Sequence, residues 1–317
     1  MRKENGMRIG IDLGGTFIKG GIVNDANEIV VKKAVPTEVK KGPAGVIENM
    51  LGLVGALLDE MQGGAASLQG IGIGSPGTVD DHTGRVLYSN NFNWENVDLA
   101  GAFTQRFGCA VKVSNDANCA ALGEMLSDKE KSGSAVLLTL GTGVGSGIIS
   151  GGKLYPGDNP GGAELGHMVI RSGGRLCSCG RRGCLESYAS ATALIESARE
   201  AAALYPDSEL AILADKNDLN GKTITDAVRK GDSGAITVFD AYLDALGEGI
   251  VNVINIFRPD VIYLGGGVCE SFDLMEDKLN AFAEKYAFGG DKALVARIKK
   301  ASGGNDAGII GAAGLLL

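Results

Sequence analysis

The chain has 317 residues, of which 44% are hydrophobic and 21% charged, so it can bury a large core and is not a disordered chain. A net charge of −8 provides no basic face of the kind that nucleic-acid binders use, so we expect no nucleic-acid partner. No apolar run reaches the roughly 18 residues that a membrane span needs. The charged start lacks the apolar core of a secretory signal, and we therefore expect a cytoplasmic protein without a membrane partner.

The predicted elements alternate between strands and helices. We expect strands at 8–13, 17–24, 28–35, 68–74, 111–114, 134–140, 145–150 and 261–264, and helices at 42–62, 117–126, 186–204, 234–257 and 307–317. Many of the 50 glycines follow the apolar runs, where tight turns occur. A strand, a Gly/Thr turn and a second strand occur twice, at 8–24 and 134–150, which suggests two lobes built on similar units. The sequence therefore predicts an α/β protein with mixed sheets and a cleft between two lobes.

Three glycine turns follow strands and have the form of phosphate-binding turns. Glycine lets backbone N–H groups approach phosphate oxygens, and an aspartate at the rim can hold Mg²⁺ through water. One such turn alone is more often only a tight turn, but three in one chain predict an ATP site. The residues concerned are Asp12, Gly14, Gly15, Thr16, Thr142, Gly143, Gly265, Gly266 and Gly267.

Asn115 and Asp116 stand where a short buried strand meets a helix. Asn and Asp are the preferred N-cap residues of helices, so capping is at least as good an interpretation as catalysis. A carboxylate at the end of a strand in an α/β cleft is also where a general base would be placed. The sequence leaves both interpretations open for Asp116.

One histidine and three cysteines gather in a glycine-rich stretch: His167, Cys177, Cys179 and Cys184. An imidazole and three thiolates complete a tetrahedral zinc site and leave no position for a catalytic water. We therefore predict a structural zinc loop; the alternative is a set of unpaired thiols on a mobile loop. Glu164 and Glu186 bracket these residues, so closing the site would bring the two carboxylates near one another. They bind substrate hydroxyls only if the loop lines the cleft, and are otherwise surface acids.

An ordered set of motifs runs along nearly the whole chain. They are DLGGTFIK at 12–19, GSPG at 74–77, NFNW at 91–94, NDANCAA at 115–121, LGTGVGSG at 140–147, ELGH at 164–167, CSCGRRGCLE at 177–186 and LGGGV at 264–268. Each motif alone is modest, whereas the ordered set with the zinc cluster is specific. The set resembles the ROK family (repressors, open reading frames, sugar kinases) of the actin-like ATPase superfamily.

The resemblance implies a two-lobed actin-like fold with duplicated ribonuclease-H-like cores. The small lobe would comprise residues 1–115, rejoined by a last helix at about 305–317. The large lobe would comprise residues 116–304 and carry the zinc loop.

The resemblance also assigns roles to individual residues. Asp116 would be the general base that takes the proton from a sugar hydroxyl. Segment 12–19, including Lys19, and the turn at Thr142 and Gly143 would hold the Mg-ATP phosphates, with Gly265–Gly267 near the adenosine. His167 would serve twice, with one ring nitrogen on zinc and the other facing the sugar. The residues expected to bind the sugar hydroxyls are Asn91, Asn115, Asp116, Glu164, His167 and Glu186.

The resemblance predicts an ATP- and Mg²⁺-dependent hexose kinase, with glucose as the expected substrate and glucose 6-phosphate as the product. Asn91 with Trp94 leans towards glucose, but family members that use fructose, N-acetylglucosamine or N-acetylmannosamine share the same motifs. The family also contains repressors with an N-terminal helix-turn-helix domain. The first phosphate turn begins close to Met1, which leaves no room for such a domain and favours a kinase.

Two alternatives remain: a non-catalytic sugar-binding regulator, and a metal-stabilised nucleotide-binding scaffold that binds no sugar. Family members are usually dimers, so a homodimer is expected.

Overall fold

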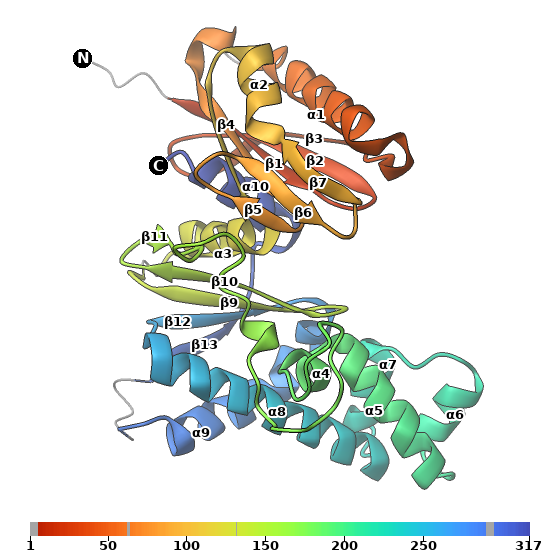
Figure 1. Ribbon diagram of the computed structural model, residues 1–317. Helices are drawn as coiled ribbons and strands as arrows, with labels where there is room; N and C mark the ends of the chain where they lie inside the picture. The colour runs from red at the N-terminus through yellow and green to blue at the C-terminus, as the bar shows by residue number, and fades with distance from the viewer. Residues whose placement is uncertain (1–5, 62–63, 131, 290–294) are drawn as a thin grey trace. The chain divides into compact units, whose positions relative to one another are not determined.

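The computed structural model describes residues 6–61, 64–130, 132–289 and 295–317 (Figure 1). The chain divides into two compact units. The first comprises residues 1–133, 147–163 and 302–317, and the second comprises residues 134–146 and 164–301.

The first unit is built on a five-stranded mixed sheet. The strands, in the order β3-β2-β1-β4-β8, are β3 (Ile29–Pro36), β2 (Phe17–Val23), β1 (Met7–Leu13), β4 (Leu68–Ser75) and β8 (Ala110–Asn115). β1 pairs antiparallel with β2 and parallel with β4, and β4 pairs parallel with β8. The three parallel strands therefore end at the same edge of the sheet, which is where α/β proteins place ligand-binding residues.

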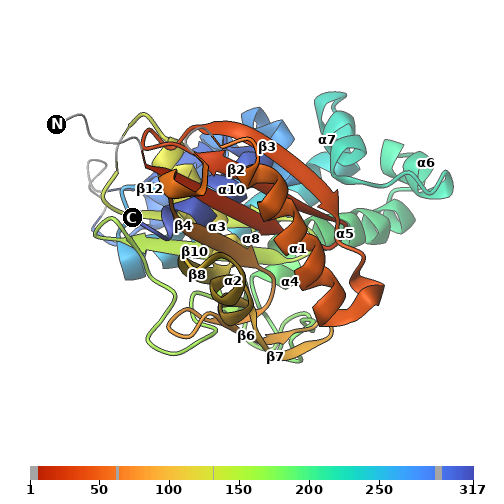
Figure 2. The same cartoon turned by 90° about the horizontal axis from the view of Figure 1, so that it is seen from above.

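Helices cover both faces of this sheet, and Figure 2 shows α1 (Gly42–Leu58) lying along one of them. Gly20 in β2 faces Leu53 and Leu57 of α1, whereas its neighbour Gly21 faces Ile309 of α10 (Gly304–Gly314). Successive residues of a strand point to opposite faces, so α1 and α10 cover opposite sides. The sequence predicted a helix at 42–62; α1 ends at Leu58, and Gln62 lies outside the described residues.

α10 lies against the sheet and α3 (Asp116–Ser127) at distances that only glycine allows. A Cβ on Gly72 of β4 would lie 1.7 Å from the carbonyl oxygen of Ala312, and one on Gly311 would lie 1.6 Å from that of Cys119. Some of the 50 glycines therefore allow backbones to pack closely and do not form turns.

The carboxylate of Glu124 in α3 fixes the start of α10. Its oxygens accept hydrogen bonds from the backbone N–H groups of Ser302 and Gly303, each at 2.9 Å. The expected helix at 307–317 is thus observed three residues earlier, because these bonds start the helix at the glycines that precede Ala307.

A small sheet and a helix occupy the segment between β4 and β8, where the sequence analysis predicted neither a strand nor a helix. They are β5 (Thr78–Asp80), β6 (Arg85–Ser89), β7 (Trp94–Asp98) and α2 (Leu99–Phe107). The strands are short and have little alternation of apolar and polar residues, so they carry a weak sequence signal.

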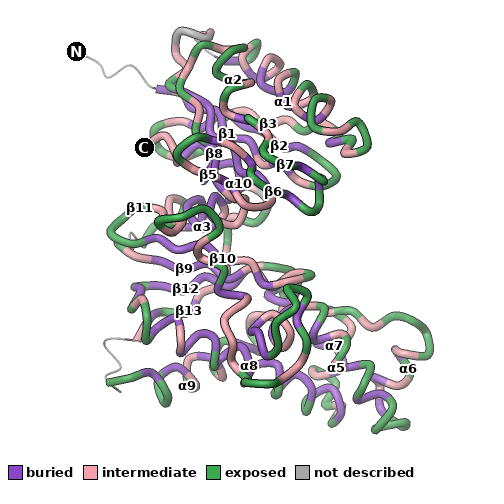
Figure 3. Tube along the Cα trace, in the orientation of Figure 1, coloured by how far each residue is buried: buried purple, intermediate pink, exposed green. Residues whose placement is uncertain are grey.

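The second sheet has the strand order β11-β10-β9-β12-β13. The strands are β11 (Lys153–Leu154), β10 (Val144–Ser150), β9 (Ala135–Leu140), β12 (Val261–Gly265) and β13 (Arg297–Lys300). β12 pairs parallel with both β9 and β13, and the boundary between the two units falls within β10. Strands β1, β4, β9 and β12 are buried over most of their length (Figure 3).

The helices of the second unit are α4 (Glu186–Ala189), α5 (Ala191–Leu204), α6 (Glu209–Asp215), α7 (Gly221–Arg229), α8 (Ser233–Phe257) and α9 (Glu276–Tyr286). The predicted helix at 186–204 is two helices, because Ser190 adopts an extended conformation and caps α5 through the N–H of Ala193. Among the described residues, no helix is long and apolar enough to cross a membrane.

The two compact units have different boundaries from the predicted lobes. The prediction began the large lobe at residue 116, whereas α3 and residues 147–163 belong to the first unit. α3 belongs there because it packs on α10, which in turn covers β1 and β4.

Candidate active site

The strand register places the predicted chemistry of the first unit at one edge of its sheet. Asp12 of β1 pairs with Gly74 of β4, and Ser75 of β4 pairs with Asn115 of β8. Because these strands are parallel, Asp12 and the N-terminus of α3 lie at the same edge. The charge of Asp116 acts on Asp12, so the two predicted carboxylates are neighbours.

The structure separates the roles of Asn115 and Asp116. Asn115 is the N-cap of α3: its Oδ1 accepts from the N–H groups of Ala117 and Asn118, and its Nδ2 donates to the carbonyl of Gly77 at 3.1 Å. Asp116 is the first residue of the helix, and the capping role that the sequence left open belongs to its neighbour.

Both carboxylates lie in surroundings that disfavour their charged forms. Burial raises the pKa of Asp116, against the opposing effect of hydrogen bonds from Ala117 and Asn115. Burial also raises the pKa of Asp12. The charge of Lys19 acts in the opposite direction and the charge of Asp116 in the same direction, and the net effect is a raised pKa. Raised carboxyl pKa values of this kind are typical of groups that accept or share protons.

Thr37, a residue that the sequence analysis missed, makes two hydrogen bonds to the first glycine turn. Thr37 is fully buried, and its hydroxyl donates to the carbonyl of Gly14 at 2.6 Å. Its backbone N–H donates to the carbonyl of Thr16 at 2.9 Å. Gly15 and Thr16 are exposed at the tip of the turn. No motif marks Thr37, because its role depends on β3 lying beside β2.

Asn91 is exposed in the connection between β6 and β7. Trp94 is fully buried, with its ring 5.2 Å from that of Phe92. The indole of Trp94 therefore packs in the core of the first unit, and the lean towards glucose that Asn91 and Trp94 gave stays a prediction.

In the second unit, Glu186 connects the second glycine turn to the loop that carries Cys177, Cys179 and Cys184, here called the cysteine loop. Its Oε2 accepts from the N–H of Val144 at 3.0 Å, and its Oε1 accepts from the hydroxyl of Ser178 at 2.7 Å. A Cβ on Gly143 would lie 2.3 Å from Oε2, so a larger residue at this position would displace the Glu186 carboxylate. Thr142 is exposed beside it.

The turn that carries Glu164 and His167 lies on the first residues of β10. A Cβ on Gly166 would lie 2.1 Å from the carbonyl oxygen of Val144. The N–H of Leu165 donates to the buried hydroxyl of Ser146 at 2.9 Å. Glu164 is exposed and His167 half-buried, so both present polar atoms at the surface of this unit.

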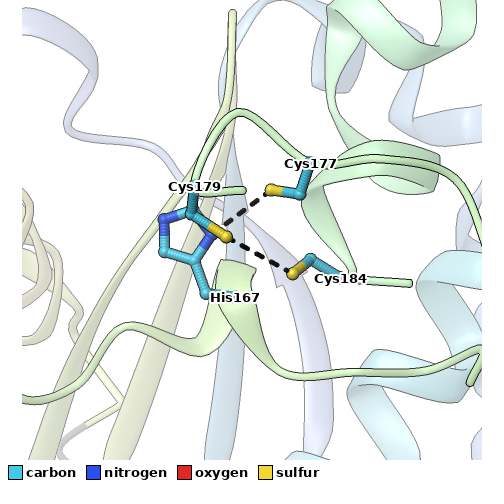
Figure 4. A group of neighbouring side chains, drawn as sticks. All are labelled: His167, Cys177, Cys179 and Cys184. Atoms are coloured by element: carbon cyan, nitrogen blue, oxygen red, sulfur yellow. Dashed lines mark hydrogen bonds between the residues drawn. The ribbon is translucent and has the colours of Figure 1, made fainter. Parts of the chain in front are cut away.

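The four predicted metal ligands converge, as Figure 4 shows. The candidate ligand atoms of His167, Cys177, Cys179 and Cys184 all lie within 4.8 Å of one another. Cys177 Sγ is 3.6 Å from His167 Nδ1, and Cys179 Sγ is 3.7 Å from Cys184 Sγ. A tetrahedral zinc ion with Zn–S bonds of about 2.3 Å would separate two sulfurs by about 3.8 Å. These residues therefore fit a four-coordinate zinc ion with His167 bound through Nδ1.

The third glycine turn follows β12. Gly266 has a φ of 99°, and a Cβ there would lie 2.3 Å from the carbonyl oxygen of Leu140 at the end of β9. Gly267 begins a 3₁₀ helix, and both Gly266 and Gly267 are exposed. The thiol of Cys269 donates to the carbonyl of Gly265 at 3.3 Å and closes the turn.

The predicted residues thus form two groups. Asp12, Gly14, Gly15, Thr16, Lys19, Asn91, Asn115 and Asp116 belong to the first unit. Thr142, Gly143, Glu164, His167, Cys177, Cys179, Cys184, Glu186, Gly265, Gly266 and Gly267 belong to the second.

Comparisons with known proteins extend over nearly the whole chain. It is 37% identical to a glucokinase of Halalkalibacterium halodurans, over 96% of this chain and 92% of that protein. It is 36% identical to a glucokinase of Thermotoga maritima, over 97% and 96%. A solved ROK glucokinase of Streptomyces griseus, in complex with glucose and AMPPNP, matches with a TM-score of 0.77 and 33% identity, over 98% of this chain and 99% of that one.

These likenesses confirm the two-lobed actin-like α/β class. The ROK family model matches residues 8–317. The chain therefore belongs to the ROK family, as its ordered motifs predicted, and is a sugar kinase of that family.

Proposed function

We propose that this protein transfers the γ-phosphoryl group of ATP to a hexose, with glucose as the substrate and glucose 6-phosphate as the product. The observation that carries the proposal is the half-buried Asp116 at the start of α3, whose carboxyl pKa is raised, beside Asp12 and the exposed glycine turn. Glucose as the substrate is supported by the glucokinases at 36% and 37% identity.

Asp116 acts as the general base in this proposal. The sugar hydroxyl oxygen forms a bond to the γ-phosphorus as the bond from phosphorus to the bridging oxygen of ADP breaks, and the hydroxyl proton passes to the Asp116 carboxylate. The raised pKa of Asp116 makes its carboxylate a better proton acceptor than an exposed aspartate. The remaining sugar hydroxyls are assigned to Asn91, Asn115, Glu164, His167 and Glu186.

The glycine turns hold the nucleotide. We assign the phosphates to Gly14, Gly15, Thr16 and Lys19 of the first unit and to Thr142 and Gly143 of the second, with Gly265–Gly267 beside the adenosine. Asp12 fits a magnesium ion bound through water, because burial and the Asp116 charge both raise its pKa and a divalent cation offsets both effects. Magnesium supplies charge neutralisation on the transferring phosphoryl group.

The Cys₃His cluster is assigned to structural zinc. Four protein ligands fill a tetrahedral shell, so the ion supplies rigidity rather than an activated water. Glu186 accepts from Ser178 inside the loop and from Val144 at the second glycine turn, so a fixed loop also fixes this turn. We also propose a cytoplasmic homodimer, as for the family.

The zinc assignment predicts about one zinc ion per chain by elemental analysis. Cys179→Ser removes one ligand and is expected to lose zinc and sugar affinity together. Cys109→Ser is the matched control, because Cys109 lies in the first unit, outside the cluster. Absence of zinc from the purified protein, or full sugar affinity in Cys179→Ser, would contradict this assignment.

The kinase proposal is tested by ADP release with Mg-ATP across glucose, mannose, fructose, N-acetylglucosamine and N-acetylmannosamine. The highest kcat/KM is expected with glucose. A higher value with another sugar would replace glucose as the substrate. Absence of turnover, combined with a rise in Tm on adding one sugar, would instead identify a sugar-binding regulator.

A further inference from the structure

A cavity lies beside the cysteine loop, in the second unit. It has a volume of about 210 Å³ and lies between the loop, α4, α5 and α8. The side chains that give it chemical character are Arg171, Arg175, Tyr188, Ser197 and Thr237. None of these residues has a role in the proposed phosphoryl transfer.

The two arginines are placed around one aromatic ring. The Cζ atom of Arg171 is 4.8 Å from the ring centroid of Tyr188, and that of Arg175 is 5.5 Å from it. The Tyr188 hydroxyl accepts from the backbone N–H of Arg175 at 2.6 Å, which fixes the ring. Cation–π contacts therefore hold two guanidinium groups beside a cavity whose lining also includes the hydroxyl-bearing side chains of Ser197 and Thr237.

Among the residues that the structure describes, Arg175 has a carboxylate partner and Arg171 does not. Arg175 donates to Ser197 and to Glu200, each at 2.9 Å, but Glu200 is largely exposed, so this ion pair is weak. Within the part of the chain that the structure describes, Arg171 has no carboxylate partner. The cavity thus carries an excess of positive charge and guanidinium donors in a fork geometry that suits phosphate.

Arg175 also lines a neighbouring cavity of about 360 Å³, together with Thr142 and Glu186. Those two residues belong to the proposed ATP and sugar sites. An anion in the smaller cavity would compete with Glu200 for the Arg175 guanidinium, and any shift of that guanidinium changes the wall of the larger cavity.

We propose that the smaller cavity is a regulatory binding site for a phosphate group, free or carried by a small phosphate monoester, and that Arg171 and Arg175 bind it. Arg171 supplies the uncompensated charge. Arg175 exchanges Glu200 for the bound phosphate and connects the site to Thr142 and Glu186. Only this connection rests on the proposed function; the binding site itself does not.

Calorimetric titration with inorganic phosphate, and separately with glucose 6-phosphate, tests the site at constant ionic strength. Arg171→Gln is expected to weaken binding at least tenfold, about the value of one charge-assisted hydrogen bond. Arg181→Gln is the matched control, because Arg181 is in the same loop but lines neither cavity. Arg171-dependent binding of either ligand supports the site, and the tighter ligand identifies the source of the phosphate.

Glu200→Gln is expected to change phosphate affinity in the opposite direction from Arg171→Gln. Removing this carboxylate frees Arg175, so phosphate is expected to bind several-fold more tightly, a gain that damage to the fold would not produce. The proposal is overturned if phosphate and glucose 6-phosphate show no saturable binding, if Arg171→Gln binds like the unmodified protein, or if Glu200→Gln leaves affinity unchanged or lower. Calorimetry needs no turnover, so failure of the kinase proposal would leave this test intact.

Discussion

At the scale of single residues, the neighbours Asn115 and Asp116 divide two tasks that the sequence could not separate. Asn115 uses its amide oxygen to cap α3 and its amide nitrogen to hold Gly77. Asp116 is left to face the edge of the sheet, where burial raises the pKa of its carboxyl group. A helix cap beside a half-buried acid is a local arrangement, but only the backbone geometry shows which of the two residues caps the helix.

Thr37 is expected to act as a positioning residue for the first glycine turn. Thr37→Val removes the hydroxyl that donates to Gly14 while keeping the shape of the side chain, so the KM for ATP should rise while the KM for the sugar changes little. Loss of one hydrogen bond should also cost about 1 kcal/mol of stability. Thr37→Ser keeps the hydroxyl and should restore the KM for ATP. Equal effects of the two variants would mean that the hydroxyl does not position the turn.

The raised pKa of Asp116 predicts a pH dependence of stability. A carboxyl group whose pKa is higher in the folded than in the unfolded state destabilises the fold as pH rises through the folded value. Asp116→Asn should therefore have a higher Tm than the unmodified protein at neutral pH. The difference should disappear as the pH falls below the ordinary aspartate range. Melting curves across pH check this, and a lower Tm for Asp116→Asn at neutral pH would contradict it.

At the scale of elements, glycine on the buried faces of β1, β4, α3 and α10 allows backbones to touch. Gly72→Ala would place a methyl carbon 1.7 Å from the Ala312 carbonyl, and overpacking of this kind costs about 1–3 kcal/mol or more. Gly52→Ala, in α1, is the matched control, because its methyl group meets nothing within 4 Å. Chemical denaturation should show a loss for the first variant and none for the second. Equal stabilities would refute close packing of α10 on β4.

Elements with strong periodicity were predicted well from sequence. β1, β2, β4, β9 and β12 lie within a residue or two of their expected bounds, because long buried runs leave few alternatives. The strands β5–β7 were missed because their burial comes from tertiary contacts rather than from a periodic pattern. The break at Ser190 was missed because Ser occurs both inside helices and at their caps.

At the scale of the whole molecule, the ordered motifs were sufficient to predict the family and the fold class. The cysteine cluster was predicted from spacing alone, because four ligands close in sequence need only one loop to meet. Asp12 and Asp116 are far apart in sequence and meet through the parallel register of β1, β4 and β8. Thr37, Glu124 and Arg175 could not be predicted, because their partners are brought to them by the fold.

The central claim is that Asp116 is the general base of a hexose kinase. The most direct test measures kcat by ADP release, and sugar affinity by calorimetry, in Asp116→Asn and the unmodified protein. We predict that kcat falls by at least the 10²–10⁴-fold typical of a lost general base, while sugar affinity stays nearly unchanged. Turnover retained in Asp116→Asn would contradict the assignment.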